Sequence, residues 1–346
     1  MQVEVPVLVC THCLFNPDDM EPIGLTEGSF YPGFVEAATW NDVVWGVPGA
    51  AAVECQFYRR EHEDLARWLG EADGFWERLE RLDEAARGAF PPGCAALALN
   101  NRSLCSLLMN ATGRRPFFYE EYLHFERPDL RTFLKRLEPY VRNPRIFYLD
   151  PEAQRTPLEE HFVRGKGALL LSNSLWLGFL SADLPSPPGV LADAVEAGGA
   201  PALGGHLHVI NAHTPFPEEC REVLAFLARP EAQGLLAERG RIVAQREGNE
   251  RLHLPQLGDQ DRAALLAGLE RGHVLRSQEI AADDYVETVL NVEVRHWQAG
   301  RISLEALLER LARKTSFYRQ SGRTRLRAIL RAEASEQPQE NDNSTS

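Results

Sequence analysis

Two short patterns place reactive side chains close together along the chain. Cys10 and Cys13 are separated by two residues directly after an apolar run, which is the spacing of a thioredoxin-like redox pair. His206, His208 and His213 could ligate zinc, because residues 206 and 208 would share one face of a strand. The sequence after residue 40 does not follow the redox fold, and no Cys or acidic partner stands at a suitable spacing from the histidines. We therefore expect structural cysteines and no metal site.

Other catalytic patterns are also missing from the sequence. Gly165-Lys-Gly167 lacks the longer phosphate-loop motif, so a turn is the better interpretation. No nucleophile, base and orienting acid are grouped together. We predict that the protein is not an enzyme and uses no cofactor.

Length and composition indicate a globular protein of two lobes. A chain of 346 residues buries a substantial core and is long for one domain. Its 37 basic and 50 acidic residues give a net charge of −13, which argues against a surface that coats nucleic acid. No apolar run approaches the roughly 18 to 20 residues that span a bilayer, so no membrane span is expected. The six cysteines are scattered, which favours reduced thiols, although their even number leaves three disulfides open.

The segment from Gly204 to Gly240 predicts a strand followed by two helices. Gly204-Gly205 lets the backbone bend, and residues 206–209 then alternate between polar and apolar. A helix should start at Pro217, where two glutamates suit a positive helix N-terminus. Its apolar positions are Cys220, Val223, Leu224 and Leu227. Pro230 should begin a second short helix that Gly240 ends.

Two earlier segments predict elements that this region could join. From Gly46 a strand runs through small residues to Phe57 and Tyr58, which could anchor a crossing between lobes. Residues 158–176 place an apolar run, from Ala168 to Leu171, between Gly165-Lys-Gly167 and Trp176.

The order of these segments, with a helix led by Trp76 and a final helix capped by Ser303, resembles the ABC-type extracellular solute-binding proteins. That family includes the maltodextrin-binding proteins, and the resemblance covers about residues 4 to 315. It implies an α/β fold, periplasmic-binding-protein-like of type II, in which hinge segments cross between two lobes and a ligand lies in the cleft. The implied division is 1–54 and 208–258 for lobe I, 55–207 and 259–331 for lobe II, and 332–346 for a disordered tail.

The resemblance also implies a small polar solute as ligand, with carbohydrate as the expected class, and an ABC permease as partner. Polar side chains suit the hydroxyl groups of a sugar, and aromatic rings stack on its apolar faces. The ligand-binding residues that the resemblance implies are Thr11, His12, Glu54, Asn173, Trp176, Asp284 and Tyr285. Asn100 and Asn101 follow a predicted buried strand, where they would either contact the ligand or cap the next helix, and capping is the more economical interpretation. The implied hinge residues are Ala52, Val53, Gly204 and Gly205.

The N-terminal sequence differs from that family. Residues 1–10 have no basic region, long apolar region or small-residue cleavage site, and the usual first strand-helix units are missing. This favours a cytoplasmic location for the chain as written, and a periplasmic or extracellular one if the N-terminus is truncated. The alternative function is the ligand-sensing domain of a transcription regulator, with DNA bound only through an upstream domain or a partner. Five arginines between residues 319 and 331 form a local basic segment, which is consistent with that alternative.

Overall fold

The structure is a computed structural model that describes most of the chain. The described residues are 14, 25, 28–40, 43–88, 90–91, 93–99, 128–148, 158–191, 201–274, 289, 291–314 and 316–317. The predictions for the strand at 3–9, the Cys10–Cys13 pair and the tail at 332–346 lie outside these residues. No helix in the described part is long and apolar enough to cross a membrane.

The described elements are a mixture of helices and strands. The helices are α2 (Pro32–Ala38), η2 (Arg60–His62), α3 (Glu63–Gly70), α4 (Phe75–Arg87), α6 (Pro128–Val141), α7 (Leu158–Val163), η3 (Ser174–Trp176), α8 (Leu177–Asp183), α9 (Pro217–Leu227), α10 (Pro230–Ala237), α11 (Arg246–Asn249), α12 (Asp259–Arg271), α14 (Asn291–Gln298) and a helix at 304–314. The strands are β1 (Thr39–Trp40), β2 (Val43–Val44), β3 (Val47–Tyr58), β4 (Ala95–Leu99), β5 (Phe147–Tyr148), β6 (Gly167–Asn173), β7 (Gly189–Leu191), β8 (Ala202–His208) and β9 (His273–Val274).

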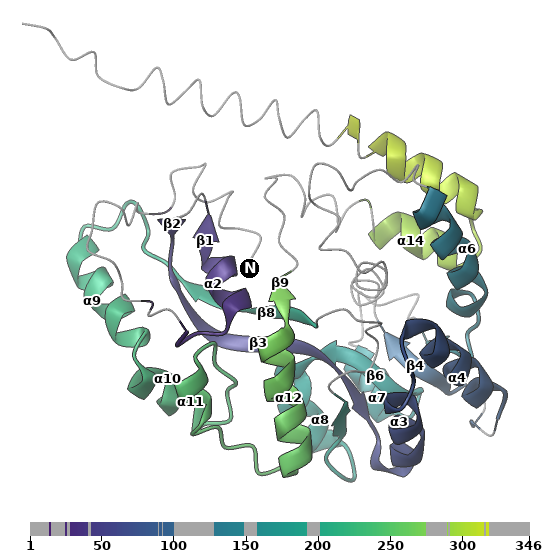
Figure 1. Ribbon diagram of the computed structural model, residues 1–346, viewed down its shortest axis with the longest axis horizontal. Helices are drawn as coiled ribbons and strands as arrows, with labels where there is room; N and C mark the ends of the chain where they lie inside the picture. The colour runs from purple at the N-terminus through teal and green to yellow at the C-terminus, as the bar shows by residue number, and fades with distance from the viewer. Residues whose placement is uncertain are drawn as a thin grey trace, which may run out of the picture.

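One long strand, β3, joins the two halves of the molecule (Figure 1). The main sheet has the order β5-β4-β6-β3-β8-β9, and β7 also pairs with β3. The first half of β3 pairs antiparallel with β8, and the second half pairs antiparallel with β6 and β7. We call the half with α2, α9, α10 and α11 the α9 side, and the half with β4 to β7, α3, α4, α7 and α8 the α4 side. Each half of β3 thus belongs to a different side.

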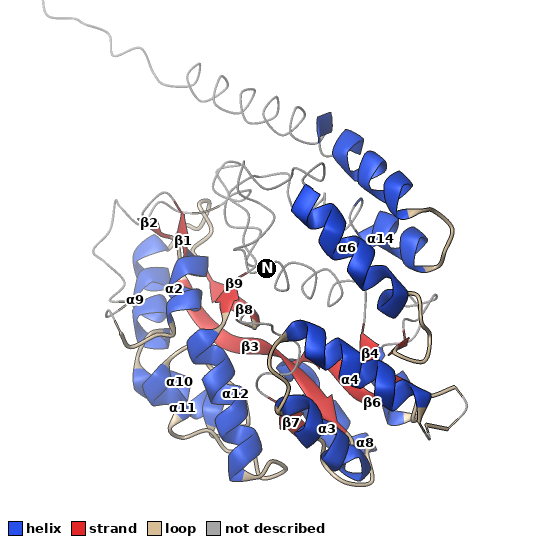
Figure 2. Ribbon diagram, turned by 45° about the vertical axis from the view of Figure 1, so that its right-hand side comes forward, coloured by secondary structure: helices blue, strands red, loops and turns tan. Residues whose placement is uncertain are grey.

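Helices cover both faces of the sheet on the α4 side (Figure 2). Over one face, α4, α6, α14 and the helix at 304–314 bury a cluster that includes Leu97, Leu137 and Trp297. Over the other face, α7 and α8 contribute Phe162 and Leu180 to a second cluster. That second cluster continues without a break into the α9 side, so apolar packing links the two sides.

The C-terminal helix at 304–314 begins as the sequence predicts. Ser303 Oγ accepts a hydrogen bond from the amide of Ala306 at 3.1 Å, which satisfies one of the free donors of the first turn. Glu293 of α14 is buried and its carboxylate contacts Lys314 at 2.5 Å and Arg310 at 3.4 Å. Burial alone would raise the pKa of Glu293, but these two cations outweigh it and lower the pKa. The ion pairs fasten the helix at 304–314 to α14.

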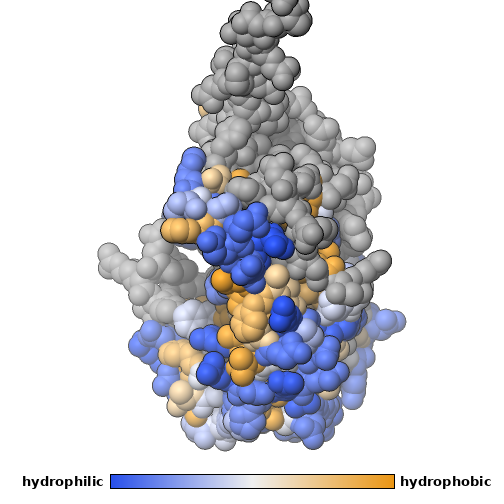
Figure 3. All heavy atoms as spheres, turned by 90° about the vertical axis from the view of Figure 1, so that its left-hand side faces the viewer, coloured by the Kyte–Doolittle hydropathy of each residue, from blue (hydrophilic) through white to orange (hydrophobic). Residues whose placement is uncertain are grey.

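The segment after Gly204 largely follows its prediction. Helices α9 and α10 begin at Pro217 and Pro230. The strand β8, however, starts earlier than residue 206 and includes both glycines, because β3 supplies backbone partners for them. On α9, Leu224 is buried, but Val223 is 56% exposed and does not join the core. Figure 3 shows this side of the molecule, where apolar residues lie among hydrophilic ones.

Candidate functional site

The two faces of β3 have different surroundings. Ala51, Val53, Cys55 and Phe57 all belong to the second core cluster, so they define what we call the back face. Because side chains alternate along a strand, residues 52, 54 and 56 point to the opposite side, the front face. The predicted ligand residue Glu54 therefore lies on the front face, and it is half-buried there.

Glu54 and Asn173 form a cross-strand pair between β3 and β6. Residues directly opposite in an antiparallel pair place their side chains on the same face, so two predicted ligand residues are brought together. Asn173 Oδ1 accepts a hydrogen bond from the amide of Leu175 at 2.9 Å, which caps η3 and orients the side chain. The amide NH₂ of Asn173 remains a donor.

Gly204 adds space next to this pair. It pairs with Ala52 across the β3–β8 ladder, and a Cβ at Gly204 would lie 3.3 Å from Asn173 Nδ2. The missing side chain therefore leaves room for the Asn173 amide. Ala52 and Gly204, both predicted hinge residues, lie side by side on the front face. The hinge role itself stays a prediction.

The other two predicted hinge residues are held differently. Gly205 has φ +154° and pairs with Ala51, next to a register shift in β3. A Cβ at Gly205 would lie 2.4 Å from the carbonyl oxygen of Ala50, so only glycine fits. Val53 is buried on the back face, and its amide donates a hydrogen bond to Ser174 Oγ at 3.1 Å.

Trp176 lies in η3 immediately after β6. Its ring meets that of Phe179 edge-on, with 5.6 Å between the centroids, and it packs partly buried against the second core cluster. The protein itself therefore uses part of the ring surface, and a stacking role for Trp176 stays a prediction. The predicted contacts Thr11, His12, Asn100, Asn101, Asp284 and Tyr285 lie outside the described residues.

Gln56 is a front-face residue that the sequence analysis missed. It is only 1% exposed, and its Oε1 accepts no hydrogen bond within the part of the chain that the structure describes. It stands two residues after Glu54, so the alternation along a strand could have identified it as a front-face neighbour. A buried polar atom of this kind normally has a partner, such as a water molecule or a ligand group.

The histidines and cysteines do not form a reactive site in the described part of the chain. His206 is exposed and His208 is half-buried, and the pKa of His208 is lowered by burial and by the neighbouring His206. No group of three His, Cys, Asp or Glu residues that could hold a metal occurs among the described residues. Burial raises the pKa of the Cys55 thiol well above its usual value, and Glu54 raises it further. Cys55 is a free thiol that stays protonated at neutral pH.

Structural comparison decides the fold. A search with the sequence found no matching family model and no matching curated protein. The structure is similar to the sugar-binding protein MalE from Xanthomonas citri, with a TM-score of 0.73 and 16% identity over 93% of this chain and 83% of that chain. It is also similar to an ABC transporter solute-binding protein from Thermotoga lettingae bound with α-D-tagatose, with a TM-score of 0.68 and 14% identity over 91% of this chain and 82% of that chain.

The chain has the type II periplasmic-binding-protein fold. The fold that the sequence resemblance implied is therefore confirmed by the structural neighbours. β3 is the strand that runs between the two sides, and its first half pairs with β8. The crossing between lobes that the Gly204–Gly240 pattern predicted for β8 stays a prediction. The assignment of residue ranges to lobes I and II stays a prediction.

Proposed function

We propose that this protein binds a small carbohydrate at the front face of β3 and serves as the solute-binding component of an ABC transporter. The observation that carries the proposal is the pairing of Glu54 with Asn173 on one face of the crossing strand. A carboxylate that accepts hydrogen bonds lies beside an amide that donates them, and a sugar hydroxyl does both. The proposed role involves binding alone, with no chemical step.

The structural neighbours support this choice of ligand and partner. One neighbour is described as sugar-binding, and the other is an ABC transporter solute-binding protein with a ketohexose bound. Neither is described as a transcription regulator, so we do not propose the sensor alternative. An ABC permease is the partner that the proposed role requires. Closure of the two sides around a bound sugar would supply the signal that such a permease reads.

The test is calorimetric titration with a panel that includes maltose, D-tagatose, glucose and galactose. We expect at least one sugar to bind the wild-type protein and to bind Glu54→Gln about 10- to 100-fold more weakly, because a hydrogen bond to a charged group contributes roughly 1.5 to 3 kcal/mol. Glu71 is exposed and lies in the turn after α3. Glu71→Gln is therefore the matched control, and it should bind like the wild type.

Two results would contradict the proposal. The first is that no sugar of the panel binds, although the protein is folded and shows a cooperative unfolding transition. The second is equal sugar affinity in the wild type and in Glu54→Gln, which would remove the front face of β3 from the site.

A further inference from the structure

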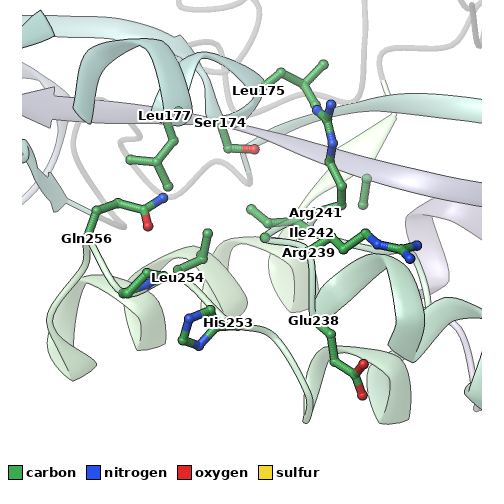
Figure 4. Close-up of a pocket in the computed structure, with 14 residues that line it drawn as sticks. Ser174, Leu175, Leu177, Glu238, Arg239, Arg241, Ile242, His253, Leu254 and Gln256 are labelled. Atoms are coloured by element: carbon green, nitrogen blue, oxygen red, sulfur yellow. The ribbon is translucent and has the colours of Figure 1, made fainter. Parts of the chain in front are cut away.

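The back face of β3 borders a cavity of about 520 Å³. One rim belongs to the α4 side and consists of η3 and the start of α8, including Ser174 and Leu177. The other rim belongs to the α9 side and consists of residues 238–242 and 253–256 (Figure 4). Ala51 of β3 lines the cavity between the two rims. The cavity therefore spans the two sides at the strand that joins them.

This cavity is separate from the front-face site. Ala51 and Glu54 are three residues apart on a continuous stretch of β3, so their side chains point to opposite faces. The register shift in β3 lies before Ala51 and does not change this relation. Similarly, Asn173 pairs with Glu54 on the front face, whereas Ser174, the next residue, lines the back cavity. A molecule in the cavity would contact none of the front-face side chains.

The side chains of the cavity combine apolar walls with positive charge. Leu177, Ile242 and Leu254 are buried apolar residues that line it. Figure 4 shows the Arg241 side chain extending from the α9-side rim toward Leu175 on the opposite rim. Within the described part of the chain, neither Arg241 nor Arg239 has a side-chain ion pair. Glu238, the nearby acid, contacts Arg251 at 3.6 Å.

This combination is suited to one chemical class of ligand. A guanidinium group binds a carboxylate through two parallel hydrogen bonds. Ser174 Oγ already accepts from the Val53 amide, so its hydroxyl hydrogen remains to be donated to an acceptor in the cavity. The apolar walls would contact the body of a molecule whose acidic group faces Arg241. A small organic carboxylate with an apolar body satisfies both features.

We propose that the back cavity is a second binding site, for a small organic carboxylate, and that its occupation weakens sugar binding at the front face. The second part rests on the proposed function. The rims belong to different sides of the molecule, so a hinge motion that closes the front face moves them apart. A ligand that contacts both rims holds the present spacing and opposes that motion. The coupling is reciprocal, so the sugar must weaken binding of the carboxylate by the same factor.

The binding part is tested by calorimetry without sugar, with 2-naphthoate as probe and the neutral 2-naphthamide as its matched control. We expect naphthoate to bind the wild type, and naphthamide to bind at least about 10-fold more weakly, because it lacks the charge that Arg241 pairs with. Arg241→Gln should weaken naphthoate binding about 10-fold. Arg145 is an exposed arginine in the turn before β5, so Arg145→Gln should leave the affinity for naphthoate unchanged.

A second variant fills the cavity without touching charge. Gly178 lines the cavity in α8, and a Cβ at this position would meet no atom within 4 Å. Gly178→Leu should therefore fold, since leucine also favours a helix more than glycine does, and should abolish naphthoate binding. Absence of naphthoate binding to the wild type would overturn the site. So would equal affinity in the wild type and in both cavity variants, or equal affinity for naphthoate and naphthamide.

The coupling part is tested by titrating the best sugar of the panel in the presence of saturating naphthoate. We expect the sugar affinity of the wild type to fall about 5-fold or more, which is the lower end of measured coupling between sites. Unchanged sugar affinity would overturn the coupling. If no sugar binds at all, the proposed function fails, but the naphthoate titrations still decide the cavity.

Discussion

The two halves of β3 are built from different residues and do different things. The first half, from Val47 to Val53, contains mostly small residues, shifts register beside Ala51 and pairs with a glycine that has a positive φ. The second half ends in Phe57 and Tyr58, which are buried in the two different core clusters. The first half therefore carries the irregularity in the ladder, whereas the second half is anchored in both cores. The predicted hinge between the two sides would need both properties.

The largest expected effect of a substitution on stability lies in the second, anchored half of β3. Phe57 of β3 is fully buried in the second core cluster, to which α7 and α8 also contribute. Phe57→Ala should lower the free energy of unfolding by about 3 to 5 kcal/mol, because the change removes apolar contacts and leaves a cavity. Urea-induced unfolding measures this change. Phe57→Leu keeps most of the apolar volume and should lose less than half as much. A loss below about 1 kcal/mol for Phe57→Ala would contradict the anchoring role.

An ion pair just beyond the anchored half ties it to α12. Arg60 Nη2 contacts Asp261 Oδ2 at 2.6 Å, and Asp261 Oδ1 accepts from the Val190 amide at 2.9 Å. Asp261 is buried, so Asp261→Ala leaves the Val190 amide without its acceptor and removes the ion-pair partner of Arg60. It should lower the free energy of unfolding by about 2 kcal/mol. Glu63 pairs with Arg67 on the surface at 3.9 Å, so Glu63→Ala is the matched control and should cost less than about 0.5 kcal/mol. Equal losses for both variants would show that the Arg60–Asp261 pair stabilises the protein no more than a surface ion pair does.

Local sequence patterns predicted several of the elements, and the resemblance to solute-binding proteins implied the fold class. Proline and glutamates at a helix start placed α9 and α10, and small residues before two aromatics predicted the crossing at β3. The same reasoning missed the early start of β8, because Gly204 and Gly205 are poor strand residues in isolation. Their backbone partners on β3 decide the outcome, and those partners are distant in the sequence.

The candidate site was only partly predictable for a related reason. Glu54 and Asn173 were both implied by the resemblance to solute-binding proteins, but their direct pairing depends on the register between β3 and β6. The back cavity could not be predicted, because its rims come from the segments near residues 174 and 241, which meet only in the folded chain. Side-chain alternation predicts on which face of a strand a residue lies, but not which other elements cover that face.

The first half of β3, with its register shift beside Ala51, is tested by substitutions of two neighbouring glycines of β8. Neither of these substitutions is expected to have a larger effect than Asp261→Ala. Gly205→Ala should lower the free energy of unfolding by about 2 kcal/mol, because φ of +154° is strained for alanine and its Cβ would press on the Ala50 carbonyl oxygen. Gly204→Ala is the matched control: its Cβ would meet Asn173 Nδ2 at 3.3 Å and Ala52 Cβ at 3.7 Å, so it should cost less than about 1 kcal/mol. Urea unfolding of both variants decides the matter. If Gly205→Ala were as stable as Gly204→Ala, the register shift beside Ala51 would not depend on the positive φ of Gly205. The contrast between the two halves of β3 would then rest on Phe57 and Tyr58 alone.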